Sequence, residues 1–377
     1  MSKSKLAELN SFKITNEELE PDDVRKLFKE RGLPENFCPV PFTTIICEPD
    51  GQVGICRLKG SNFHAGMIQD NSLEEIWNNE FMQNWRQEFL SGNVVTCERE
   101  IRHRGCNLCS ENNKMLPLID LDKIQSKPPV KFTANFNGWC NLECVMCHVW
   151  KKPNGLYDEI NFWEKAETEI FPFVVEMDLL SGEPFLQKDT WRLIDMVAPV
   201  NPDCLWTFTT NCAYKLNDKM KGYLDKIKIK NFIISIDSWD ADNFAEIRLK
   251  GNLGQVLQTA SDFADYNKSR VERGLSDMGF VVNYLTQQGT TEQMGNFLDY
   301  CKKMNFRPSP IYAYEPLENS VITYPLKRRK EVLDWYLENL SWDQLSMGMK
   351  AIVPTIDSLP EIERAAYLLR FKEKSDE

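Results

Sequence analysis

Three cysteines stand close together in the segment NGWCNLECVMC: Cys140, Cys144 and Cys147, with C-x3-C-x2-C spacing. Closely spaced thiolates bind metals, and a structural zinc ion takes four protein ligands. Three thiolates in one short loop can instead bind three irons of a [4Fe–4S] cluster and leave the fourth iron open to a small molecule. The spacing favours the cluster, and a zinc site completed by a distant cysteine or by His148 is the alternative.

Three short motifs follow later apolar segments of the chain. They are SGEPFL at residues 181–186, TTNC at 209–212 and SIDS at 235–238, and Arg248 comes after the last of them. Each motif alone is compatible with a tight turn, a strand terminus or a surface charge. At successive strand ends, however, they would meet the cysteine loop at the one edge of a parallel sheet where such folds place their chemistry.

Six short apolar segments predict the strands that position these motifs. They alternate with segments long enough for helices, which is the pattern of β/α units and a parallel sheet. The expected strands span residues 130–136, 173–180, 205–210, 231–237, 279–285 and 310–314. The pattern fits either an incomplete barrel or a doubly wound sheet.

These features resemble the radical S-adenosylmethionine (radical SAM) superfamily over about residues 130–315. CNLECVMC is similar to the family's cysteine loop, and SGEPFL, TTNC and SIDS are similar to its G-G-E-P, T-N-G and S-I-D-G motifs. The resemblance implies an enzyme with an α/β fold: a partial (β/α)6 parallel barrel, here with a small N-terminal cysteine-rich α+β module.

The resemblance also implies the cofactor chemistry. S-adenosylmethionine would bind the open iron and be cleaved by one electron from the cluster, and the resulting 5′-deoxyadenosyl radical would abstract a substrate hydrogen. By their motif positions, Gly182 and Glu183 would bind the methionine amino group. Arg248 would pair with its carboxylate, and Ser235 would contact ribose or carboxylate. Met146, where the family usually has an aromatic residue, would contact adenine. The candidate cofactor-binding residues are Met146, Gly182, Glu183, Asn211, Ser235, Asp237 and Arg248.

Cys212 stands where the family's T-N-G motif has glycine. A thiol on this face could give a hydrogen atom to a substrate radical, which makes Cys212 a candidate catalytic residue. Free cysteine is also commonly a small buried side chain that fills a gap. The packing role is the favoured of the two.

The segment before the barrel contains six of the twelve cysteines. TTIICEPDGQVGIC predicts a β-hairpin, and NSLEEIWNNEFMQNWRQEFL predicts one amphipathic helix capped by Asn71 or Ser72. The cysteine spacing, with SLEEIWN followed by an arginine, resembles the auxiliary iron–sulfur module called SPASM or twitch, which normally follows the barrel. The expected ligands of an auxiliary [4Fe–4S] cluster are Cys38, Cys56, Cys106 and Cys109, with Cys97 and Cys47 as alternates. A zinc ribbon is the alternative.

The whole chain limits the classes of function. Its 377 residues suit one large domain plus a small one. A net charge of -11 disfavours electrostatic binding to nucleic acid. No leader or membrane-spanning run is recognised, so we expect a cytoplasmic protein without a membrane partner, in which cysteines serve metals rather than disulfides. We expect five segments along the chain: a helical segment at residues 1–37, the SPASM/twitch-like module at 38–112, a linker at 113–129, the partial barrel at 130–323 and a helical segment at 324–377.

The expected function is that of a radical SAM oxidoreductase or a related radical SAM enzyme. Its substrate would be a peptide or protein side chain that is oxidised, crosslinked or epimerised, and a sugar or small metabolite is the alternative substrate. A flavodoxin or ferredoxin would serve as one-electron donor. A non-catalytic iron–sulfur electron-transfer or redox-sensing protein would explain the cysteines but not Glu183, Asp237 and Arg248 at strand ends. A zinc-stabilised binding protein is a third possibility.

Overall fold

The computed structural model describes residues 19–60 and 63–376. The expected N-terminal helical segment therefore lies partly outside the described residues. Within the described part it contains one helix, α2 (Pro21–Glu30), which starts at a proline and has acidic side chains in its first turn.

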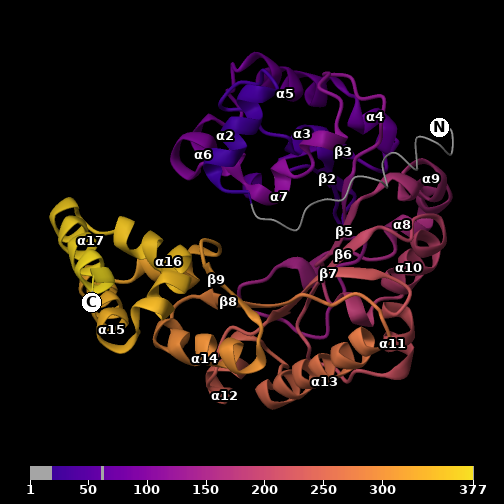
Figure 1. Ribbon diagram of the computed structural model, residues 1–377. Helices are drawn as coiled ribbons and strands as arrows, with labels where there is room; N and C mark the ends of the chain where they lie inside the picture. The colour runs from indigo at the N-terminus through magenta and orange to yellow at the C-terminus, as the bar shows by residue number, and fades with distance from the viewer. Residues whose placement is uncertain (1–18, 61–62, 377) are drawn as a thin grey trace.

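The N-terminal elements gather at one end of the molecule (Figure 1). The predicted hairpin is confirmed, since β1 and β2 pair antiparallel. The predicted single amphipathic helix is instead two helices, because Asn79 accepts a hydrogen bond from the backbone of Met82 and begins a new helix. The elements are α3 (Val40–Thr43), β1 (Thr44–Cys47), β2 (Gln52–Gly54), β3 (His64–Met67), α4 (Leu73–Trp77), α5 (Glu80–Ser91), α6 (Glu98–Arg104) and α7 (Ser110–Asn113).

All six predicted strands of the central region form, and helices separate them. The strands are β4 (Lys131–Ala134), β5 (Glu176–Leu179), β6 (Leu205–Thr210), β7 (Lys228–Ser235), β8 (Phe280–Thr286) and β9 (Arg307–Tyr312). The helices are α8 (Leu156–Glu159), α9 (Phe162–Glu169), α10 (Lys188–Val200), α11 (Asp218–Leu224), α12 (Ala241–Ile247), α13 (Leu253–Glu272) and α14 (Met294–Met304).

In the described residues the fold is mixed α/β with a mainly parallel sheet of nine strands, in the order β3-β2-β1-β4-β5-β6-β7-β8-β9. Strands β4 to β9 are parallel and lie in chain order, whereas a doubly wound sheet reverses its strand order. Strand β1 pairs parallel with β4. The N-terminal hairpin therefore extends the same sheet that carries the cysteine loop.

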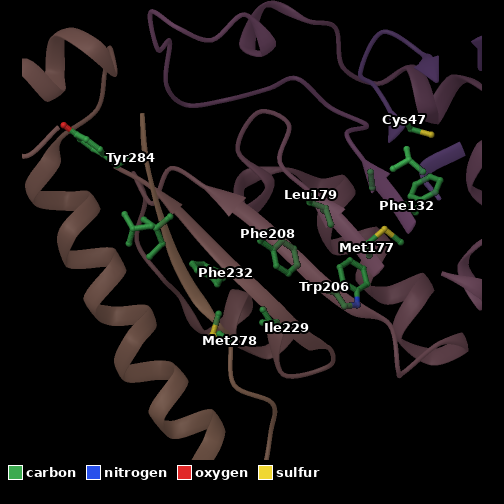
Figure 2. Packing of buried hydrophobic residues seen from close by; sticks show 14 of the residues in the cluster. Cys47, Phe132, Met177, Leu179, Trp206, Phe208, Ile229, Phe232, Met278 and Tyr284 are labelled. Carbon is green, nitrogen blue, oxygen red and sulfur yellow. The ribbon is translucent and has the colours of Figure 1, made fainter. Parts of the chain in front are cut away.

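The two faces of the central strands differ in polarity because neighbouring residues of a strand point to opposite faces. One face is apolar, and its core runs from Cys47 in β1 past Phe132, Met177 and Phe208 towards Tyr284 in β8 (Figure 2). The other face has a row of polar residues paired strand to strand, which are Thr133, Asp178, Thr207 and Asn231.

The C-terminal segment is helical. It consists of α15 (Leu326–Asn339), α16 (Trp342–Asp357) and α17 (Glu361–Asp376), which lie at the side of the molecule away from α8 to α10 (Figure 1). Among the helices of residues 19–60 and 63–376, none has the length and hydrophobicity needed to cross a membrane.

Candidate functional site

The cysteine loop leaves the end of β4 and is fastened to the segment that contains Arg248. The backbone N–H of Val145 donates to the carbonyl of Ile247 at 3.0 Å, and that of Glu143 donates to Leu249 at 3.2 Å. These two bonds join the loop to the end of α12, which lies about 100 residues later in the chain. The loop is thus held on both sides of Cys144.

The surroundings raise the pKa values of two of the three thiols in this loop. The pKa of Cys140 is raised to about 11, mainly by burial and in smaller part by the negative charges of Glu183, Cys144 and Cys147. Burial also raises the pKa of Cys144, while the guanidinium of Arg248 lowers it. Thiolates gathered in a partly buried loop repel one another, and a bound metal would offset that repulsion.

Arg248 is buried beside the loop and is paired with Asp237. Its Nη2 lies 2.6 Å from Asp237 Oδ2, its Nε donates to the same oxygen at 2.8 Å, and its Nη1 lies 4.0 Å from the sulfur of Cys144. The other carboxylate oxygen of Asp237 accepts from the backbone of Leu285 at 3.0 Å. The ends of β7 and β8 and the cysteine loop therefore meet at Arg248.

Gly182 allows the end of β5 to approach the start of the cysteine loop. Its φ is +59°, and a Cβ there would lie 2.1 Å from the carbonyl oxygen of Trp139. That oxygen accepts from the backbone N–H of Glu183 at 3.0 Å and from Nε2 of Gln187 at 2.8 Å. Only glycine fits this combination of positive φ and close contact.

Glu183 is fully buried, and its carboxylate is occupied by protein donors. Oε1 accepts from the hydroxyl of Thr210 at 2.9 Å and from the backbone of Phe185 at 3.2 Å, and Oε2 accepts from the backbone of Asn211 at 2.8 Å. Burial raises its pKa to about 7, although these hydrogen bonds act in the opposite direction. The side chain ties the end of β5 to the end of β6.

Asn211 connects the end of β6 to the cysteine loop. Its Nδ2 lies 3.6 Å from the sulfur of Cys140 and donates to Asn141 at 2.9 Å. The following residue, Cys212, has a φ of +52°, which explains why glycine suits this place. The Cys212 side chain is buried in the apolar core, and burial raises its pKa well above the ordinary value.

Ser235 and Met146 are both half-buried. Ser235 ends β7, where it pairs with Asn283 of β8, and Met146 lies inside the cysteine loop. The hydrogen bonds and ion pairs thus bring together the loop, Gly182, Glu183, Asn211, Asp237 and Arg248. Sequence reasoning missed Trp139, Asn141, Gln187 and Thr210, whose roles depend on contacts across the site rather than on a motif.

In the N-terminal part, four cysteines line one cavity, and they come from four different positions along the chain. They are Cys38, Cys56, Cys97 and Cys106. Burial raises the pKa of Cys38 well above its ordinary value, and the other three thiols raise it further. Cys109 is exposed, and Cys47 is buried in the apolar core.

A single metal ion and a cubane cluster make different demands on their ligands. In the described ranges, no three His, Cys, Asp or Glu side chains are arranged to hold one metal ion. A cubane needs wider spacing, because each thiolate binds a different iron. The thiols gathered at both places have the chemistry that a [4Fe–4S] cluster requires of its ligands.

Comparison with known proteins finds one matching domain family and several curated relatives. Residues 38–110 match SPASM, the iron-sulfur cluster-binding domain. A protein named "Probable GTP 3',8-cyclase" from Methanococcus maripaludis is 25% identical over 183 residues, which are 46% of this chain and 55% of that protein. The GTP 3',8-cyclase of Clostridium botulinum is 32% identical over 132 residues, which are 32% of this chain and 39% of that protein. The matches thus span about half or less of these relatives.

Among solved structures, SuiB of Streptococcus suis bound to S-adenosylmethionine matches with a TM-score of 0.41 and 17% identity, over 78% of this chain and 66% of that chain. Similarity at this level carries no argument about function. The SPASM match and the GTP 3',8-cyclase homologues agree with the cysteine loop and the strand-end motifs. These matches support a radical SAM enzyme with a SPASM iron–sulfur domain in its N-terminal part.

Proposed function

We propose that this chain is a radical SAM oxidoreductase, or a related radical SAM enzyme, that abstracts a hydrogen atom from an organic substrate. The observation that carries the proposal is the convergence of the ends of β5 and β6, and of Arg248 at the end of α12, on the cysteine loop. Asn211 reaches Cys140, Arg248 reaches Cys144, and Gly182 approaches Trp139 at the start of the loop. The parallel strands β4 to β9 would form the partial (β/α)6 barrel typical of the superfamily.

Cys140, Cys144 and Cys147 would hold three irons of a [4Fe–4S] cluster and leave the fourth open. When bound and reduced, such a cluster supplies the electron that cleaves S-adenosylmethionine. The protein residues fix the loop from both sides, and Arg248 offsets the negative charge of Cys144. The chain thereby supplies orientation and electrostatics for the cofactor chemistry.

Four residues are assigned to the S-adenosylmethionine site. Arg248 would bind the methionine carboxylate through Nη1, since Nε and Nη2 are occupied by Asp237. Gly182 would leave room for the amino group, Ser235 would contact ribose or carboxylate, and Met146 would contact adenine. Each of these roles follows from the position of the residue in a family motif.

Glu183, Asn211 and Asp237 are better suited to positioning the residues of the proposed S-adenosylmethionine site than to binding the cofactor themselves. The carboxylate of Glu183 is enclosed and accepts three hydrogen bonds, so we assign it to joining β5 and β6 rather than to direct contact with the methionine ammonium group. Asp237 positions Arg248, and Asn211 positions the loop at Cys140.

The SPASM domain would hold an auxiliary [4Fe–4S] cluster that orders the substrate or accepts an electron from it. The proposed substrate is a peptide or protein side chain, because modules of this sort accompany peptide modification. A small-molecule substrate is the second candidate, because the curated relatives are named for a reaction of GTP. With either kind of substrate, a flavodoxin or ferredoxin would deliver electrons to the enzyme.

An anaerobic experiment tests the proposed function without knowledge of the substrate. Reconstituted protein should contain about eight irons, four at each of two sites, and should form 5′-deoxyadenosine slowly from S-adenosylmethionine and a reductant. Alanine at Cys140, Cys144 and Cys147 together should remove about half of the iron and all of the 5′-deoxyadenosine. Stoichiometric zinc without iron in anaerobically purified protein would contradict the proposal.

A further inference from the structure

We infer that Cys97, not Cys109, is the fourth ligand of the auxiliary cluster, and that the indole N–H of Trp85 donates to its thiolate. The inference rests on the proposed auxiliary cluster and adds to it a ligand set and a residue that tunes the cluster. With four protein thiolates, this cluster would have no open iron. It would therefore accept an electron or help to order the substrate through the surrounding protein, without binding the substrate at an iron.

The residues that line the cavity indicate which four cysteines are the ligands. Cys38, Cys56, Cys97 and Cys106 line it together with apolar side chains such as Phe89, whereas Cys109 is not among its lining residues. Cys97 is buried and Cys109 is exposed. A cluster bound through Cys109 would leave the buried thiol of Cys97 beside the metal without a role.

Two side chains hold the chain at Cys97 in position. The carboxylate of Glu88, from α5, accepts from the backbone of Val95 at 2.9 Å, from the backbone of Thr96 at 2.8 Å and from the Thr96 hydroxyl at 2.7 Å. Lys59, three residues after Cys56, donates to the carbonyl of Thr96 at 2.8 Å. Cys97 is thus fixed against the part of the chain that supplies Cys56, as a preorganised ligand would be.

Trp85 presents an unused donor to the same thiol. In the described residues its Nε1 is buried and has no hydrogen-bond partner, and the residue lines the cavity. Trp85 and Cys97 line the same cavity, so the sulfur of Cys97 is an available acceptor for this N–H. Buried donors without acceptors are rare in native proteins. A thiolate bound to iron would be a better acceptor than the neutral thiol.

The expected consequence of this hydrogen bond is electronic. Hydrogen bonds to the sulfurs of an iron–sulfur cluster set its reduction potential. An N–H donor stabilises the more negative, reduced form and so raises the potential. Trp85 would therefore act as a positioning and tuning residue of the auxiliary cluster.

Single-cysteine variants test the ligand set by metal content. In the anaerobically reconstituted full chain, Cys97→Ala should lose about four of about eight irons, and Cys109→Ala should keep all of them. The reverse result, with iron lost only in Cys109→Ala, would overturn the inference and leave the proposed function intact. Parent protein with only about four irons, all dependent on Cys140, Cys144 and Cys147, would instead remove the auxiliary cluster itself.

Trp85→Phe tests the hydrogen bond, with Phe89→Leu as control because Phe89 lines the same cavity and has no donor. Iron content should be unchanged in both. The auxiliary potential of Trp85→Phe should fall, by up to about tenfold in the one-electron equilibrium or about 59 mV. Electron–nuclear double resonance should also lose an exchangeable proton coupled to the cluster. An unchanged potential and proton signal, or an equal shift in the control, would refute the role of Trp85.

Discussion

Glu183 is the residue whose environment most changes the expected chemistry of the site. A carboxylate at the end of a strand could face a cofactor ammonium group, but this one is fully buried and bound by Thr210, Asn211 and Phe185. Burial favours the neutral form, while hydrogen bonds from N–H and O–H donors favour the charged form. The effect of burial is the larger of the two, since the pKa of Glu183 rises to about 7.

This raised pKa predicts a pH-dependent stability that Glu183→Gln should remove. A pKa raised from 4.5 to about 7 means that the folded chain keeps a proton that the unfolded chain has lost. The stabilisation is complete below the unfolded pKa and is lost as pH rises through the folded pKa, by roughly 3 kcal/mol in all. Anaerobic denaturant unfolding at pH 5 and pH 8 measures the difference for parent and variant.

The control for this measurement is Glu169→Gln, because Glu169 is exposed. Its pH dependence should equal that of the parent protein. Equal pH dependence in Glu183→Gln and the parent would show that Glu183 is ionised in the folded protein throughout this range.

Local signals predicted much of this site at the level of residues. The cysteine spacing, the glycine at position 182 and Arg248 each belong to a short motif, and the structure joins all three through the cysteine loop. The enclosed state of Glu183 could not be predicted, because it depends on partners 27 and 28 residues away. The core position of Cys212 fits the favoured packing role.

At the scale of elements, helix α5 organises the SPASM domain through Arg86, the arginine that follows the SLEEIWN motif. The guanidinium is fully buried and donates to the carbonyls of Pro41 at 2.8 Å, Lys123 at 2.9 Å and Trp77 at 2.7 Å. Burial lowers its pKa to about 9. One side chain thus fastens α3, α4 and the segment before β4 to α5.

Arg86→Met should destabilise the SPASM domain strongly. The variant keeps an apolar stem but leaves three carbonyls without their donor, each at about 1–3 kcal/mol. We expect the free energy of unfolding to fall by more than about 3 kcal/mol, with faster backbone hydrogen exchange across residues 38–110. Arg99→Met, at an exposed position of α6, should change neither quantity. Parent-like exchange in Arg86→Met would contradict this role.

Periodicity predicted the existence of the elements better than their boundaries and partners. The six central strands and the hairpin form where apolar segments indicated them. The expected single helix after residue 71 divides at Asn78 and Asn79, since an asparagine side chain can cap a helix that propensity alone would continue. The pairing of β1 with β4 joins segments more than 80 residues apart, and nothing in either segment specifies it.

On the scale of the whole molecule, the SPASM domain and the central strands share one sheet and several ion pairs. Arg57, next to the expected ligand Cys56, donates to Asp178 at 2.5 Å on the polar face of β5 and to Thr133 at 3.1 Å. Lys230 of β7 pairs with Glu111 of α7 at 2.5 Å and also with Glu176 of β5. Movements of the two proposed cluster sites relative to each other are therefore restricted.

This continuity predicts that the central region does not fold alone. A chain of residues 113–377 would expose the edge of β4, whose backbone groups pair with β1 between Thr44 and Cys47 in the full chain. Unpaired edge strands promote aggregation. We expect this fragment to be insoluble when produced alone and to be rescued by co-production of residues 1–112, as size-exclusion chromatography and iron analysis would measure.

The opposite outcome is equally specific. A soluble monomer of residues 113–377 that binds about four irons would show that the central sheet is stable without β1. The central region would then fold independently of the hairpin, and the ion pairs of Arg57 and Lys230 would only orient the SPASM domain on it. If rescue by residues 1–112 is required, the sheet is completed across the boundary between them. In that case a change that loosens the SPASM domain, such as Arg86→Met, should also lower the iron content at Cys140, Cys144 and Cys147.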